Sequence, residues 1–347
     1  MRWTRFISVS HFTMLSFALC AVVSAQTPAG YYSASLQDGA EVAAVESHGP
    51  ACGCDVGCDN GCDSGCDGYC ACDCIGNWWD NTTIFLAGDG WKGVGEIPAG
   101  GYGNNFGLRT GFNTGLGIGE SNLRAQIGGS VGFYDFRGRS LGDGDNTEVE
   151  TQLFLTTGVF KRSDIACGDA WAYGVVWDLM NDNNYGVGGD DLTLSQFRGQ
   201  LGYAVNECNE IGVWGAVRAS DDDWSVSRGA PRTQLRTVNQ GNVFWHHNWQ
   251  FGADTTVYGG VADGLSQGTF GLLGNAPLSN SVALFGGFNY YAPSATAGQP
   301  GATEEFWNVT FGIAWYPGAK AVNHTVSGWK GMPLLDVANN GTFQATP

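Results

Sequence analysis

The sequence predicts an all-β protein: a closed antiparallel up-and-down barrel of the outer-membrane type, with about 12 strands. Three observations predict this fold. The chain opens with an export signal, segments of about ten residues alternate between apolar and polar or small side chains, and the connections between those segments alternate between long and short. Together they indicate a curved sheet with one face toward lipid.

The chain divides into five regions where its composition changes. Residues 1–25 are typical of a signal peptide, residues 26–51 of a flexible lead, and residues 52–76 of a disordered Cys-rich linker. Residues 77–317 are expected to form the barrel, and residues 318–347 a C-terminal tail.

The first region has the three-part layout of a secretory signal. Arg2 and Arg5 form a basic start, an apolar run from Phe12 to Val23 follows, and cleavage is expected after Ala25. The apolar run is too short to span a bilayer as a helix. Removal of the two arginines changes the net charge from −17 to −19, which argues against nucleic acid as a partner.

Period-two alternation predicts the individual strands. In the last of them Trp307, Val309 and Phe311 lie on one face, and Asn308 and Thr310 lie on the other. A strand of this length, tilted by about 40°, covers roughly 20 Å along the membrane normal, close to the height of a lipid-facing band. The expected strands are 82–89, 105–113, 122–133, 148–159, 171–179, 196–205, 210–218, 237–249, 251–261, 268–276, 281–291 and 307–315.

The connections alternate in length along the chain. Outer-membrane barrels have long external loops and short periplasmic turns, so both ends of the barrel segment are expected on the periplasmic side. The connection at 262–267 fits least well, because it is short for its side. The long connections are 88–103, 137–147, 180–191, 219–233 and 292–303, and the short ones are 115–121, 162–169, 206–209, residue 250 and 277–280.

A soluble β-sandwich or propeller is the competing fold. It has the same period of two, and its apolar face would be a buried core instead of a lipid-facing surface. The alternation of long and short connections favours the barrel.

Polar side chains on the opposite strand face would line a lumen. Separated cationic and anionic groups in a water-filled lumen pass small hydrated solutes and bias them by charge, which predicts a porin-like channel for passive diffusion. The alternative is a structural envelope anchor, since a barrel of about 12 strands is narrower than most open porins. The residues expected to line the lumen are Arg109, Arg124, Glu148, Glu150, Asp178, Arg198, Glu210, Arg218 and Asp254.

The sequence does not predict an enzyme or a cofactor. His246 and His247 are adjacent on an expected strand, so they point to opposite faces and cannot act as a pair. No HExxH zinc motif occurs in the chain, and no serine nucleophile elbow is expected, because the sequence offers no helix after its glycine-rich turns.

The linker holds a dense cluster of cysteines, most of them spaced by the unit Cys-Asp-x-Gly. In an oxidising compartment such a cluster is expected to form disulfides, either within the linker or to other proteins of the envelope. Bound zinc and a passive spacer are the alternatives, so a metal role stays open. Cys167 and Cys208 fall in short connections of the same parity, where they could bridge. The linker cysteines are Cys52, Cys54, Cys58, Cys62, Cys66, Cys70, Cys72 and Cys74.

The C-terminal part of the chain resembles a known family. The stretch Glu305–Gly318, EFWNVTFGIAWYPG, and the ending Met332–Phe343, MPLLDVANNGTF, are similar to an uncharacterised planctomycete family of exported, porin-like β-barrel proteins. The resemblance covers roughly residues 76–347. It implies a place in the outer membrane, with membrane lipid as partner, and implies no activity and no functional residue.

The tail departs from ordinary outer-membrane barrels, which usually end on an aromatic residue of the last strand. Here about 30 residues follow Tyr316. Three arrangements are open: the tail plugs the lumen, lies against the periplasmic rim, or dangles.

Overall fold

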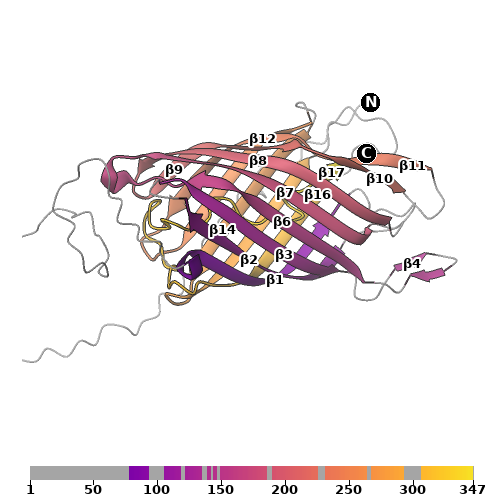
Figure 1. Cartoon of the computed structure of the whole chain (residues 1–347), viewed down its shortest axis with the longest axis horizontal. Coiled ribbons are helices and arrows are strands. Elements are labelled where there is room, and N and C mark those ends of the chain that lie inside the picture. Colours follow the sequence, from indigo (N-terminus) through magenta and orange to yellow (C-terminus); the bar gives the residue numbers. More distant parts are fainter. Residues whose placement is uncertain are drawn as a thin grey trace, which may run out of the picture. The chain divides into compact units, whose positions relative to one another are not determined.

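The computed structural model of the chain describes residues 78–93, 105–118, 122–134, 139–141, 144–146, 149–185, 190–225, 231–263, 267–292 and 306–346, all within the unit Cys52–Pro347. Twelve strands form a closed antiparallel barrel, which confirms the predicted fold class (Figure 1). Among the described residues no helix is long and apolar enough to cross a membrane.

Each barrel strand pairs with the next one along the chain, and β1 closes the barrel against β16. The strand expected at 268–276, for which the sequence signal is weak, is present as β14. The barrel strands are β1 (Thr82–Lys92), β2 (Asn105–Gly117), β3 (Arg124–Tyr134), β6 (Glu150–Lys161), β7 (Trp171–Tyr185), β8 (Asp190–Asn206), β9 (Asn209–Arg218), β12 (Gln240–Asn248), β13 (Asp254–Ala262), β14 (Gln267–Pro277), β15 (Val282–Ala292) and β16 (Phe306–Trp315).

Short polar side chains close the short turns. Between β8 and β9, the Asn206 side-chain oxygen accepts a hydrogen bond from the backbone N–H of Cys208 at 3.0 Å. Between β14 and β15, the Ser279 hydroxyl accepts one from the backbone N–H of Val282 at 3.1 Å. These local bonds replace the strand ladder where the chain reverses, which explains the turn signals in the sequence. We call the end of the barrel that carries these turns the short-turn rim.

The opposite end carries strands that the sequence did not predict. The connection at 219–233 contains β10 (Asp221–Ser225), and β11 (Arg232–Thr237) follows it. They form a small sheet in which β11 pairs with β10 on one side and with β17 (Ala345–Thr346) on the other (Figure 1). A further hairpin joins β4 (Arg139–Leu141) and β5 (Gly144–Asn146). The strand expected at 237–249 begins at Gln240, because the backbone N–H of Val238 instead donates to Gln344 O at 2.9 Å.

The two faces of the barrel wall have opposite chemistry. On β16, Phe311 and Ile313 are 62% and 51% exposed on the outside, whereas Asn308 and Thr310 face inward and are buried. This arrangement is the reverse of a soluble β-sandwich, in which the large apolar side chains are buried between layers. The competing sandwich fold is therefore excluded.

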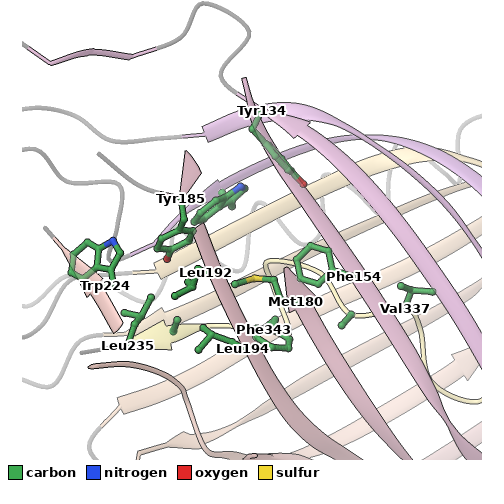
Figure 2. Packing of buried hydrophobic residues seen from close by; sticks show 13 residues of the cluster. Tyr134, Phe154, Met180, Tyr185, Leu192, Leu194, Trp224, Leu235, Val337 and Phe343 are labelled. Carbon is green, nitrogen blue, oxygen red and sulfur yellow. The ribbon is translucent and has the colours of Figure 1, made fainter. Parts of the chain in front are cut away.

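An apolar cluster fills the inside of the barrel toward its long-connection end. Wall residues such as Tyr134, Phe154, Met180 and Leu194 meet side chains of the last residues of the chain, among them Phe343 (Figure 2). The interior is thus neither uniformly polar nor lined by wall side chains alone.

Two leucines on opposite faces of β8 test which side of the wall is buried. Leu194 is fully buried inside, while Leu201 is 44% exposed outside. In detergent micelles we expect Leu194→Ala to lower the free energy of unfolding by about 2–5 kcal/mol, because it leaves a cavity. Leu201→Ala is expected to change it by about 0.5 kcal/mol or less. Urea unfolding followed by tryptophan fluorescence measures both values, and equal effects would contradict the assignment of the two faces.

Candidate functional site: the lumen and its C-terminal segment

The chain continues past β16 as two segments. Residues 317–331, which we call the rim segment, cross the short-turn rim, and residues 332–346, the lumen segment, run through the inside of the barrel. Figure 1 shows this path in yellow, from the end of the barrel that carries the short turns to the end that carries β10, β11 and β17.

The rim segment is held to four of the short turns. The backbone N–H groups of Ala321, Asn323 and Val326 donate to carbonyl oxygens of the β14–β15, β12–β13 and β8–β9 turns, at 2.8, 3.1 and 2.8 Å. The Ser327 hydroxyl then accepts a hydrogen bond from Ile165 N, in the β6–β7 turn, at 3.2 Å. The segment therefore follows the rim from the last hairpin back toward the first.

A glycine turns the chain from the rim into the lumen. Gly331 has a φ of 88°, a conformation that side chains disfavour, and a Cβ there would lie 2.3 Å from the Asn81 side-chain oxygen. Directly afterwards, Arg162 Nε donates to Met332 O at 2.8 Å, and its Nη2 donates to Pro333 O. Burial lowers the pKa of the Arg162 guanidinium from its usual value, and the carboxylates of Glu210, Asp336 and Asp254 oppose that effect.

Polar wall side chains bond the backbone of the lumen segment. Asn113 donates to Leu335 O at 3.0 Å, and Arg198 donates to Asp336 O at 2.6 Å. The Thr156 hydroxyl accepts from Ala338 N at 3.0 Å. Since a buried backbone group without a partner is costly, these bonds explain how an irregular segment is accommodated inside the barrel.

Asn340 joins the segment to the centre of the wall. Its amide donates to Gln152 Oε1 at 2.7 Å, to the Tyr134 hydroxyl at 3.3 Å and to Asp89 at 3.4 Å. Tyr134 in turn donates to Asp89 at 2.7 Å, and Asn308 donates to the other Asp89 oxygen at 2.8 Å. This network was not predicted from the sequence, because Asp89 and Tyr134 lie at or beyond the ends of the expected strands.

The lumen segment closes the barrel lumen. Val337, Ala338, Asn340 and Phe343 are all at most 4% exposed, and Phe343 packs edge-on against Phe154 with ring centroids 6.0 Å apart. Of the three arrangements open for the tail, the structure combines two: its first half lies on the rim and its second half plugs the lumen.

The expected lumen-lining residues fall into three groups. Arg109, Glu150, Asp178, Arg198, Glu210 and Asp254 are buried inside the barrel. Arg124 is half-buried, and Arg218 is exposed at the end of β9. Glu148 lies outside the described residues. A role in permeation stays a prediction for the whole set.

The buried charges inside the barrel are mostly paired. Arg198 contacts Asp178 through two bonds, Nε to Oδ2 at 2.5 Å and Nη2 to Oδ1 at 3.0 Å. Glu150 accepts from Asn105 and from Gln152, both at 3.0 Å. Such pairs order the wall and the segment, because breaking one leaves an uncompensated buried charge.

A cavity of about 280 Å³ remains between the C-terminal segments and the wall, which here includes residues of β1, β2, β8, β9 and β12 to β16. Its lining includes Arg162, Glu210, His246, Asp254 and Asp336. Among the described residues no group of three or more His, Cys, Asp or Glu side chains could hold a metal ion.

The eight linker cysteines lie outside the described residues, so their bridging stays a prediction. Cys167 and Cys208 occur in turns of the same rim, since Trp171 pairs with Tyr203 where β7 starts and β8 ends. Within the described part of the chain no disulfide joins these two cysteines.

A family model matches the chain over residues 81–345, a span that includes the barrel, the rim segment and nearly all of the lumen segment. The family is described as one of unknown function, DUF6666. The match agrees with the expected resemblance to an uncharacterised family, whereas the expected planctomycete origin stays a prediction. No curated protein matches the chain.

Several solved structures share a distant likeness with the chain. Outer membrane phospholipase A from Escherichia coli is 11% identical with a TM-score of 0.39, over 67% of this chain and 95% of that one. The anion-selective porin from Comamonas acidovorans is 13% identical with a TM-score of 0.30, over 67% of this chain and 98% of that one. The beta domain of the Bordetella autotransporter BrkA is 13% identical with a TM-score of 0.34, over 68% and 98%. Likenesses this low transfer neither activity nor ligand.

The Asn340 network provides a test of how firmly the lumen segment is held. We expect Asn340→Ala to raise the amide hydrogen exchange rate of a peptide covering residues 332–344 by about tenfold or more, because buried wall acceptors lose their donor. Asn181→Ala is the matched control, since Asn181 bonds Thr193 on the neighbouring strand at 3.0 Å and not the lumen segment. Mass spectrometry measures the rates, and equal exchange in both variants would contradict this role of Asn340.

Proposed function

Because this chain belongs to the DUF6666 family, whose function is unknown, we propose its function from the structure: it is an outer-membrane β-barrel, closed by its own C-terminal segment, that serves as an anchor in the envelope. The observation that carries the proposal is the lumen segment, which fills the barrel and takes up the hydrogen bonds of its polar wall. Catalysis has no support in the arrangement of the described residues, and its absence stays a prediction.

The outer surface supports a place in a membrane. Aliphatic and aromatic side chains cover it, including Val243, which is 65% exposed, and Phe106, which is 68% exposed. A closed barrel pairs every strand edge, so no row of unpaired backbone groups meets hydrocarbon. Near the short-turn rim the aromatic rings gather: Trp79 packs against Trp315 at 5.8 Å, and Trp171 against Tyr203 at 5.0 Å. Aromatic belts of this kind occur at the interfaces of membrane barrels.

The position of the Cys-rich linker supports an anchoring role. It precedes the short 3₁₀ helix η1 (Trp78–Asn81), which leads into β1 at the short-turn rim. In barrels of this type short turns face the periplasm, an oxidising compartment. The linker cysteines would then meet partner proteins beneath the membrane, while the barrel holds the chain in place.

A porin-like channel for small hydrophilic solutes is the second candidate. It is favoured by the polar inner wall, in which Arg109, Gln126 and Arg198 are all buried. Three of the contacts that the wall makes, however, go to the lumen segment: Asn113 and Gln126 both donate to Leu335 O, and Arg198 donates to Asp336 O. Diffusion therefore requires that the segment leaves, so the closed barrel is the better supported of the two.

Substitution of an outward residue tests the contact with lipid. Val213 lies near the middle of β9 and is 50% exposed. In lipid vesicles we expect Val213→Arg to lower the free energy of unfolding by about 2–4 kcal/mol, because the guanidinium faces hydrocarbon. Val213→Ala is expected to have a much smaller effect. Reversible urea unfolding in vesicles measures both, and equal stabilities would contradict the lipid-facing assignment.

Planar-bilayer recordings test the closed lumen. We expect the refolded full chain to show no conductance steps, because the lumen segment excludes a water path. A variant that lacks residues 332–347 and keeps the rim segment is expected to show discrete open steps. Deletion of residues 345–347 alone is the control, since it removes β17 and leaves the lumen filled.

The same recordings decide between the two candidates, provided that each protein shows the heat-modifiable gel mobility of a folded barrel. Steady conductance of the full chain, equal to that of the variant without residues 332–347, would overturn the closed anchor in favour of a porin-like channel.

A further inference from the structure

We propose that the cavity beside the lumen segment is a binding site for a small organic cation that carries ammonium groups. The site goes beyond the anchoring role, because it requires only the closed barrel with its lumen segment in place. The cavity has a volume of about 280 Å³, which suits a compact molecule of a few heavy atoms.

The cavity contains carboxylates whose hydrogen-bonding capacity is unused. Glu210 is only 4% exposed and lines the cavity, yet it accepts no hydrogen bond from any described residue. Asp254 is 8% exposed, and its Oδ2 has no partner within the described part of the chain. A buried charged acceptor without a donor is costly, so an occupant that donates hydrogen bonds to Glu210 would be stabilised here.

The backbone next to Glu210 leaves space for its carboxylate. A Cβ at Gly202, on the neighbouring strand β8, would lie 2.1 Å from Glu210 Oε1. The absence of a side chain at Gly202 therefore lets the carboxylate lie along the wall of the cavity. Glu210 also pairs across strands with His246, and Asp254 lies on the next strand beyond it.

The lumen segment contributes a third carboxylate to the same cavity. Asp336 has an exposed side chain although barrel and tail surround it, which means that its exposure is to the cavity. Among the described residues, Arg198 donates to the Asp336 backbone oxygen, and no hydrogen bond reaches its carboxylate. Residues of the barrel wall and of the lumen segment therefore form the site together.

The cationic side chains that line the cavity direct their hydrogen bonds and ring contacts to other groups, although Arg162 also interacts electrostatically with Glu210, Asp254 and Asp336. Arg198 is paired with Asp178, Arg162 donates to the carbonyl oxygens of Met332 and Pro333, and Arg109 lies over the Phe85 ring at 5.0 Å. His246 Nε2 is 3.7 Å from Asp254 Oδ1, beyond hydrogen-bond distance. The carboxylates of Glu210 and Asp336 therefore line the cavity as acceptors that receive no hydrogen bond from the described residues. The unpartnered donors Arg109 Nε and Asn275 Nδ2 are buried in the wall, as is Asp254 Oδ2, so these three atoms are not open to an occupant.

Aromatic side chains favour an organic cation over a bare ion. Trp214 and Tyr258 pack edge-on at 5.0 Å, and both line the cavity together with Phe244, Tyr316 and Trp329. Aromatic faces attract ammonium groups and also pack against the carbon chain that bears them. One end of the occupant would meet the carboxylates, and its apolar part would meet the rings.

Calorimetric titration of the full chain in nonionic detergent tests the site, with 1,4-diaminobutane as the probe. We expect saturable binding with one equivalent per chain. Glu210→Gln and, separately, Asp254→Asn are each expected to weaken it by about tenfold or more, because each removes a negative charge that lines the cavity. Two variants are used so that the test survives if one of them fails to fold.

Glu207→Gln is the matched control, because Glu207 is exposed in the turn three residues before Glu210. Its substitution removes the same single negative charge. It is expected to leave the affinity unchanged. Tetramethylammonium, which lacks N–H donors, is expected to bind more weakly than diaminobutane. No heat of binding with the full chain, an equal loss in Glu207→Gln, or equal binding of magnesium chloride would each overturn the proposal, since the last two would indicate general attraction to an acidic protein.

Discussion

The pairing of β1 with β16 is the interaction on which the rest of the structure depends. It runs from Ile84 opposite Trp315 to Lys92 opposite Trp307, and it turns an open sheet into a closed wall. An open sheet would leave an edge of unpaired backbone groups and would not separate an inside from an outside. Once the wall is closed, period-two alternation sends alternate side chains to two environments, which explains the apolar outer face and the polar inner face together.

A closed wall of this size creates a second requirement, which the C-terminal segment meets. Buried charges and amides inside a narrow barrel need partners, and wall residues satisfy only some of one another. Arg198 bonds both the wall and the segment. Its Nε and Nη2 donate to the Asp178 carboxylate on the wall, and Nη2 also donates to Asp336 O of the segment. The segment is therefore an integral part of the interior, bonded at the rim, in the middle and at the far end.

The sequence predicts the wall well because each wall strand is recognised locally. Alternation in stretches such as 307–315 needs no knowledge of the neighbouring strand, and turn residues such as Asn206 act within three positions. Strand β11 was missed because one of its partners, β17, lies more than a hundred residues away. Strand β10 pairs only with β11 within this sheet, so it was missed together with it. The path of the tail could not be predicted from the sequence either. The stretch MPLLDVANN shows neither the period of a strand nor that of a helix. The donors that bond Leu335 O, Asn113 and Gln126, lie some two hundred residues earlier. The sequence indicates which charged residues face inward. It does not indicate which of them pair, because the register between neighbouring strands decides the pairs.

The passage of the lumen segment changes which side of the barrel the chain ends on. Twelve strands alone bring a chain back to the rim where it started, as β1 and β16 illustrate. The segment adds one more crossing, and it delivers β17 to the edge of β11 at the opposite end. If the barrel sits in a membrane, residue 82 and residue 346 therefore belong to different compartments. A barrel of even strand number thus places its first described strand and β17 at opposite rims, as a single membrane-crossing segment would.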